Sequence, residues 1–147
     1  MAIVTLAEAR AQLQILDTDV TQDVTLQAYY DAITPMIEEK ANEVIDQRTI
    51  TEDYDLTDPQ APSTYGIYGR TTTLYLRQRP VISITSVTNV NTGYAWTVGQ
   101  LRVRPDGRLR VMTGMPFYGF ISIVYVAGYA VVPFNYKQAA LLILQHN

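Results

Sequence analysis

The only histidine of this chain is His146, so the search for catalytic chemistry starts there. The chain has 147 residues and no cysteine, which excludes disulfides, thiolate metal sites and cysteine nucleophiles. Nucleophilic catalysis of the Ser-His-Asp kind would therefore depend on this one imidazole ring. A solvated or interface histidine is the simpler interpretation. We expect no catalytic residue and classify the chain as a non-enzyme.

Two segments resemble ligand-binding motifs but lack essential members. Residues 17–23, DTDVTQD, have the alternating carboxylates of a calcium loop. Gln22 stands where that loop requires glycine, and Ala28 stands where it requires glutamate. The short segment GIYG has neither the length of a dinucleotide-binding loop nor the lysine of a phosphate loop. The sequence therefore predicts no metal and no cofactor.

A run of arginines around a turn is the strongest chemical feature, LRVRPDGRLRV at residues 101–111. Proline, aspartate and glycine in succession are typical of a β-turn. Alternation in the flanking strands places four aliphatic side chains on one face and four arginines on the other. These arginines are Arg102, Arg104, Arg108 and Arg110. Because like charges across paired strands repel, we expect an anionic partner, either phosphate or carboxylate, to cover them.

The charge distribution favours carboxylate as that partner. Residues 1–60 contain thirteen acidic and three basic residues, a net charge of −10, whereas residues 61–147 contain eight basic and one acidic, a net charge of +7. The whole chain is acidic, with a net charge of −3, while a nucleic-acid-binding protein usually has a basic domain. We therefore expect a protein partner. The alternative from another class is a single-stranded nucleic-acid-binding β module, in which the eleven tyrosines stack on bases.

The amino-terminal region that must position the acidic residues is predicted to be helical. Thr5 and Glu8 have the spacing of a capping box at the start of a short helix. A longer helix is predicted from about residues 22 to 46, with one apolar stripe and with Pro35 expected to bend or interrupt it. On its other side we expect a candidate acidic surface of four residues, which are Asp31, Glu38, Glu39 and Asp46.

The arginines lie in a region predicted to be β. Residues 49–127 contain seven short segments of strand character separated by turn residues, and their close spacing favours antiparallel pairing. The segment FISIVYV, residues 120–126, is apolar on both faces, so we predict a central strand. The sequence thus predicts a hairpin within an antiparallel β region.

The last element is predicted to be a helix over residues 133–147, with Pro133 in its first turn. The segment AALLIL within it is apolar all the way round, so it requires cover from its own domain or from a partner. Candidate inter-subunit or partner contacts along this helix are Phe134, Tyr136, Leu141, Leu142 and Leu144.

Together these elements predict one α+β domain over residues 1–147. It would comprise a helical acidic region at 1–48, a β-rich basic region at 49–127 and the carboxyl-terminal helix. No apolar run approaches the roughly 20 residues that span a bilayer, and no secretory signal is evident. We therefore expect a soluble intracellular protein without a membrane partner.

The carboxyl-terminal segment resembles the signature of a known family. VYVAGYAVVPFNYKQAALLILQH is similar to the V-x-Y-x-A-G-Y, V-P and K-Q-A-hydrophobic signature of tailed-bacteriophage head–tail connector proteins, also called adaptor or head-completion proteins. RQRPVISITSVTNV resembles a strand of that family, and the opening residues resemble its first pair of helices. The resemblance extends over the whole chain in the same order.

This resemblance implies a structural virion protein without catalysis or cofactor. Such proteins form a ring of about a dozen copies beneath the portal and join the DNA-filled head to the tail. The implied partners are other copies, the portal and a stopper or tail-completion protein, with DNA passing through the channel without specific binding. Assembly would occur in the host cytoplasm. The alternative within the neck is that the chain is itself the stopper or tail-completion protein.

On this interpretation each charged set has a candidate role. The acidic surface would line the channel or face a neighbour, because an acidic lining lets DNA slide without binding. The hairpin arginines would pair with carboxylates of a neighbouring copy or of the portal. Reversal of Arg104 and Arg108 to glutamate should then block ring assembly.

Overall fold

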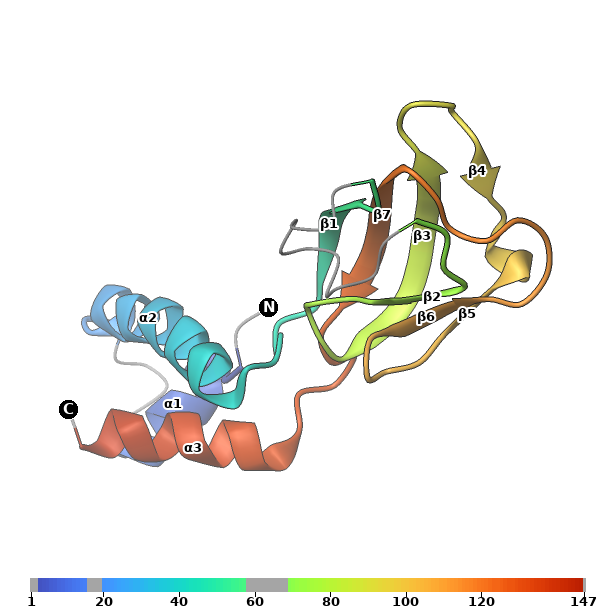
Figure 1. Ribbon diagram of the computed structural model, residues 1–147. Helices are drawn as coiled ribbons and strands as arrows, with labels where there is room; N and C mark the ends of the chain where they lie inside the picture. The colour runs from blue at the N-terminus through green and yellow to red at the C-terminus, as the bar shows by residue number, and fades with distance from the viewer. Residues whose placement is uncertain (1–2, 16–19, 58–68, 147) are drawn as a thin grey trace. The chain divides into compact units, whose positions relative to one another are not determined.

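Helices and strands occupy different parts of the chain (Figure 1). The structure, a computed structural model, describes residues 3–15, 20–57 and 69–146. The chain folds into two compact units, a helical unit of residues 1–47 and 129–147 and a β unit of residues 48–128. This content confirms the predicted α+β class, with helices before and after an antiparallel β region.

The first helix, α1, spans Leu6–Leu13 and begins as predicted. Thr5 Oγ1 accepts a hydrogen bond from Glu8 N at 3.2 Å, and the Glu8 carboxylate accepts one from Thr5 N at 2.8 Å. This capping box satisfies backbone donors that have no partner inside the helix. The helix ends at Gln14, which takes the left-handed conformation.

The second helix, α2, is shorter than predicted. It spans Asp23–Ala41, whereas the sequence pattern indicated about residues 22 to 46, and it continues through Pro35. The helix ends because Asn42 takes the left-handed conformation, with φ of 54°, and donates its N–H to the Glu38 carbonyl. The prediction that Pro35 could interrupt the helix is wrong.

The residues that follow α2 explain the error in its boundary. Val44 and Ile45 are buried although neither is helical, so apolar spacing continues beyond the helix end. Ile45 accepts a backbone hydrogen bond from Tyr129, and Asp46 forms a parallel bridge with the same residue. Backbone pairing with Tyr129, and not helical hydrogen bonding, therefore holds this segment in place.

The third helix, α3, spans Phe134–Gln145 and begins directly after Pro133. It packs against α1 and α2, and the three helices enclose one apolar core (Figure 1). The buried members of this core are Ile3, Val4, Ala9, Leu26, Tyr30, Ile33, Ile37, Ile45, Ala140 and Leu144.

The larger sheet of the β unit is antiparallel and has the strand order β1-β7-β3-β4. Its strands are β1 (Arg48–Asp55), β7 (Phe120–Ala127), β3 (Val81–Asn89) and β4 (Ala95–Trp96). β7 lies between β1 and β3, and every second residue along it is fully buried. The prediction of a central, antiparallel strand at this position is confirmed.

The smaller sheet carries the arginines. Its order is β2-β6-β5, formed by β2 (Thr73–Tyr75), β6 (Arg108–Val111) and β5 (Leu101–Val103), and the 3₁₀ turn η2 (Val98–Gln100) precedes β5. Leu74 and Leu109 are directly paired and fully buried, so the inner face of this sheet contributes to the core of the β unit.

Candidate functional site

The predicted Pro-Asp-Gly turn joins β5 and β6. Gly107 N donates to the Arg104 carbonyl at 3.0 Å, and Gly107 has φ of 89°, which L-amino acids with a side chain rarely adopt. A Cβ atom on Gly107 would also lie 2.7 Å from the Leu76 carbonyl oxygen. Asp106 Oδ1 accepts the Arg108 N–H at 3.0 Å. The turn residues therefore determine where the arginines point.

The strands of this hairpin alternate as the sequence predicted. Leu109 and Val111 are buried, and Leu101 and Val103 are half-buried. The opposite face carries the arginines, of which Arg108 is half-buried and the other three, Arg102, Arg104 and Arg110, are exposed. Arg102 and Arg110 are direct cross-strand partners, so like charges do face each other.

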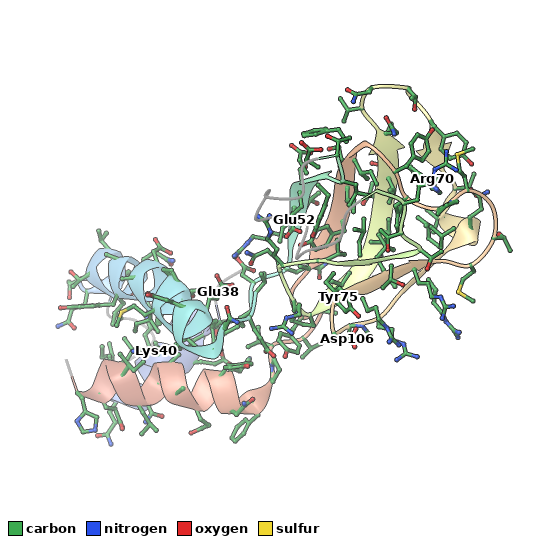
Figure 2. All side chains as sticks on the ribbon, in the orientation of Figure 1. Glu38, Lys40, Glu52, Arg70, Tyr75 and Asp106 are labelled. Carbon is green, nitrogen blue, oxygen red and sulfur yellow. The ribbon has the colours of Figure 1, made fainter. Side chains whose placement is uncertain are left out.

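Two further residues share this face, and the sequence analysis did not include them. Tyr75 on β2 is the cross-strand partner of Arg108 and is 48% exposed (Figure 2). Met112 continues the alternation of Arg108 and Arg110 and is 51% exposed. We define the arginine face by six residues, which are Tyr75, Arg102, Arg104, Arg108, Arg110 and Met112. The two-residue period pointed to Met112, but only the strand order reveals Tyr75.

The described residues place no carboxylate in an ion pair with this face, although Asp106 lies in the turn between Arg104 and Arg108. Among the described residues, none of its four arginines forms an ion pair. The ion pairs that the described residues do form include Arg10 with Asp23 and Lys137 with Glu8, both within the helical unit. Within the part of the chain that the structure describes, the face is therefore a positive surface without an ion-pair partner.

The four predicted acidic residues differ in exposure and do not all lie on α2. Asp31 and Glu39 are exposed on α2, but Glu38 is half-buried, and its Oε1 atom accepts the N–H groups of Ile45 at 2.7 Å and Asp46 at 3.0 Å. Asp46 lies beyond the end of α2 and is half-buried. The placement of all four on one side of the helix is wrong for Asp46, because the helix ends before it, and Glu38 is partly used to cap the chain that follows. A channel-lining or neighbour-facing role for these residues stays a prediction.

The candidate contacts on α3 divide into covered and exposed residues. Leu144 is buried in the core of the helical unit, and Leu141 packs half-buried against that core. Phe134 and Leu142 are 73% and 53% exposed. The expectation was cover from the chain's own domain or from a partner. α1 and α2 supply the first on one side of the helix, and cover of Phe134 and Leu142 by a partner stays a prediction.

Tyr136 is held by an internal hydrogen bond. Its hydroxyl donates to Glu43 Oε2 at 2.8 Å, and the Tyr129 hydroxyl donates to the same oxygen at 2.7 Å. The hydrogen bond to Glu43, followed by burial, raises the pKa of Tyr136, and burial followed by the same bond raises that of Tyr129. Both tyrosines belong to the carboxyl-terminal signature, which therefore serves folding. Glu43 was missed because it is 93 residues from Tyr136.

An apolar cavity of about 570 Å³ opens between α2 and α3. Its lining includes Met36, Ile37, Ala139 and Ile143, with Lys40 at its side. Cavities of this kind accept apolar side chains or ligands. The sequence analysis did not anticipate this cavity.

The described residues contain neither a cluster of metal ligands nor a membrane-spanning helix. Within residues 3–15, 20–57 and 69–146, no three histidine or carboxylate side chains gather as metal ligands. The calcium-like segment falls partly outside the described residues, since Asp17 and Asp19 are not among them. No helix in the described part of the chain combines the length and apolar character needed to cross a membrane.

Comparison with known proteins gives one family match and several structural matches. A family model described as "HCP: Head completion protein" matches residues 2–147. A chain from the "Neck of empty GTA particle computed with C6 symmetry" superposes with a TM-score of 0.71 and 20% identity, over 98% of this chain and 77% of that chain. A second chain, from the "Neck of native GTA particle computed with C12 symmetry", superposes with a TM-score of 0.64 and 18% identity. This match covers 99% of this chain and 80% of that chain. No curated protein matches by sequence at a significant level. At these identities the structural matches show a common fold.

Proposed function

Because the chain belongs to the head completion protein family, we propose that it is a ring-forming adaptor in the neck of a tailed phage or phage-like particle. In this role it joins the portal to the tail or neck proteins and helps to complete the DNA-filled head. The observation that carries the proposal is the family match over residues 2–147, which includes both the helices and the strands.

The ring is supported by the source of the structural neighbours. Those two chains come from particle necks with C6 and C12 symmetry, and they share the fold over nearly all of this chain. A closed ring requires two different complementary surfaces on each copy. The arginine face and the acidic helical unit satisfy that requirement, and we propose a ring of about a dozen copies.

The proposed partners are other copies, the portal and a stopper or tail-completion protein. The role is structural, involves no catalysis, and places the protein in the neck of the particle after assembly in the host cytoplasm. DNA would pass through the ring without specific binding. The exposed residues Phe134 and Leu142 of α3 are candidate contacts with the portal.

The test is to mix the purified chain with portal rings of the same particle and to measure the mass of the complex. We expect many copies to bind each portal ring. If intact portal rings bind no copies, the adaptor role fails and the stopper or tail-completion role is favoured.

A second candidate function rests on the arginine face. Four arginines that form no ion pair with a described residue, beside an exposed tyrosine, also suit single-stranded nucleic acid, in which bases stack on aromatic rings. The net charge of −3 opposes this function. A DNA titration at several salt concentrations distinguishes the two.

A further inference from the structure

The arginine face has the composition of a protein interface. Tyrosine, methionine and arginine are enriched at interfaces, whereas lysine and carboxylates are depleted there. Tyr75 and Met112 are each about half exposed. Tyr75 lies on the edge strand β2 beside Arg108, and Met112 directly follows β6. A free protein gains nothing from exposing such a face, and a bound carboxylate-bearing partner would remove the repulsion between Arg102 and Arg110.

The chain itself offers a surface of opposite charge. The helical unit has nine acidic and three basic residues, a net charge of −6, and the β unit has eight basic and five acidic residues, a net charge of +3. Most described acidic side chains of the helical unit are engaged internally. Glu8 pairs with Lys137, Asp23 with Arg10, Glu38 with backbone N–H groups and Glu43 with two tyrosines.

Asp31 and Glu39 are different, because both are exposed on the outward side of α2. They are eight residues apart, about 12 Å along the helix axis, and Pro35 lies between them. Leu26, Ile33 and Ile37 mark the opposite, buried side. Asp31 accepts one hydrogen bond from Gln27 at 3.1 Å and forms no ion pair with a described residue.

We propose that the arginine face of one copy binds the outward side of α2 of a second copy, through Asp31 and Glu39. This inference rests on the proposed ring, names its copy-to-copy interface, and selects a neighbouring copy over the portal or DNA. The contact is heterologous, since each copy contributes its arginine face to one neighbour and its α2 to the other. Charge complementarity at this contact would set the orientation of each copy relative to the next one in the ring.

The test uses two variants that each carry one reversed surface. Arg102→Glu/Arg104→Glu/Arg108→Glu/Arg110→Glu makes both surfaces acidic, and Asp31→Lys/Glu39→Lys makes both basic. Sedimentation at low salt, over chain concentrations up to millimolar, measures association between copies. We expect the unmodified chain to associate and either variant alone to associate roughly tenfold or more weakly. An equimolar mixture should recover association, because each reversed surface then meets a complementary one.

A control variant separates the face from overall charge. Arg70→Glu makes the same charge change as Arg104→Glu, but Arg70 lies beside Tyr118, away from Tyr75 and Asp106 in Figure 2. We expect Arg70→Glu to associate normally and Arg104→Glu to be impaired. Circular dichroism and melting temperature establish that every variant is folded.

Three results would overturn the inference: an unmodified chain that stays monomeric throughout, folded single-surface variants that associate normally, or a mixture that fails to recover. If the variant with all four arginines changed to glutamate loses only portal or DNA binding, the face belongs to that partner instead. Portal binding is measured separately. Copies that associate as expected but bind no portal ring contradict the adaptor role and leave this interface in place.

Discussion

At the residue scale, the carboxylate of Glu52 joins four groups of the β unit (Figure 2). Its Oε1 accepts from the Tyr125 hydroxyl at 2.6 Å and from Gln78 N at 3.3 Å. Its Oε2 accepts from the Tyr54 hydroxyl at 2.5 Å and from Arg77 N at 3.1 Å. Burial, and then the hydrogen bond to Glu52, raises the pKa of both tyrosines. Glu52 lies on β1. Its hydrogen bonds therefore link the residues that connect β2 with β3 to strands β1 and β7.

We expect Glu52→Ala to lower the free energy of unfolding by about 2–3 kcal/mol, because two buried hydroxyls lose a charged acceptor. Urea unfolding measures this change. Asp53→Ala is the matched control, since Asp53 is the exposed neighbour on the same strand, and it should change stability by less than about 0.5 kcal/mol. Equal effects of the two substitutions would show that Glu52 has no such role.

The pair of Glu8 and Lys137 predicts a response to acid. Its atoms are 2.8 Å apart, and the hydrogen bond to Lys137, followed by that to Thr5, holds the pKa of Glu8 below its ordinary value. A lowered pKa means that the folded state favours the carboxylate. This stabilisation is complete above the ordinary pKa near 4.5 and is lost as the pH falls through the lower, folded value.

The measurement is the melting temperature of Glu8→Gln against the unmodified chain between pH 3 and 7. Both side chains are about one third exposed, so solvent screens the pair and the difference at pH 7 should be about 0.5–1 kcal/mol. The difference should shrink below pH 4.5. A difference that stays constant with pH would contradict the assignment.

At the element scale, α3 has a buried side and an exposed side. Ala140 and Leu144 face the core of the helical unit, whereas Phe134 and Leu142 face solvent. A large exposed apolar side chain has little influence on folding and is available to a partner. The buried side therefore serves stability, and the exposed side is the candidate portal contact.

Substitution of the two leucines by alanine separates these roles. Leu144→Ala should cost about 2–4 kcal/mol of unfolding free energy because it leaves a cavity in the core. Leu142→Ala should leave the melting temperature nearly unchanged and weaken binding to portal rings. Thermal unfolding and a portal-binding titration measure both. Normal portal binding by the doubly substituted Phe134→Ala/Leu142→Ala chain would exclude this side of α3 from the interface.

At the scale of the whole molecule, opposite charges are separated between the two units. The helical unit has a net charge of −6 and the β unit one of +3. The proposed interface between copies uses this separation, and the net negative charge of the chain repels DNA at long range. Both properties suit a ring through which DNA passes.

We therefore expect only weak binding of single-stranded DNA by the isolated chain, with a dissociation constant above roughly 10 μM at 150 mM salt. Fluorescence anisotropy at several salt concentrations measures it, with the Arg104→Glu/Arg108→Glu variant as the control. If all four arginines bound phosphates, the logarithm of the affinity would fall with that of salt with a slope of about −3. Tight binding with that slope would favour the nucleic-acid-binding function.

Local patterns along the chain predicted much of the fold. The capping box at Thr5, the strand alternation on both sides of Gly107 and the central strand at residues 120–126 are all as predicted. Each depends on residues within a few positions of one another, where backbone preference and side-chain period act directly. The positions of the four hairpin arginines followed from the same alternation.

What the tertiary structure decided is which distant residues meet. The Tyr136 hydroxyl donates to Glu43. Tyr75 shares the arginine face because β2 pairs with β6. The Glu38 carboxylate accepts the backbone N–H of Ile45 in the chain that follows α2. The end of α2 was misjudged for the same reason, since Val44 and Ile45 are buried by tertiary packing and not by a helix. Periodicity reports which face of an element is apolar, but not which element covers it. Charge and alternation in the sequence thus predicted a positive face, and strand order and packing determined which further residues share it and which acidic residues of α2 are exposed.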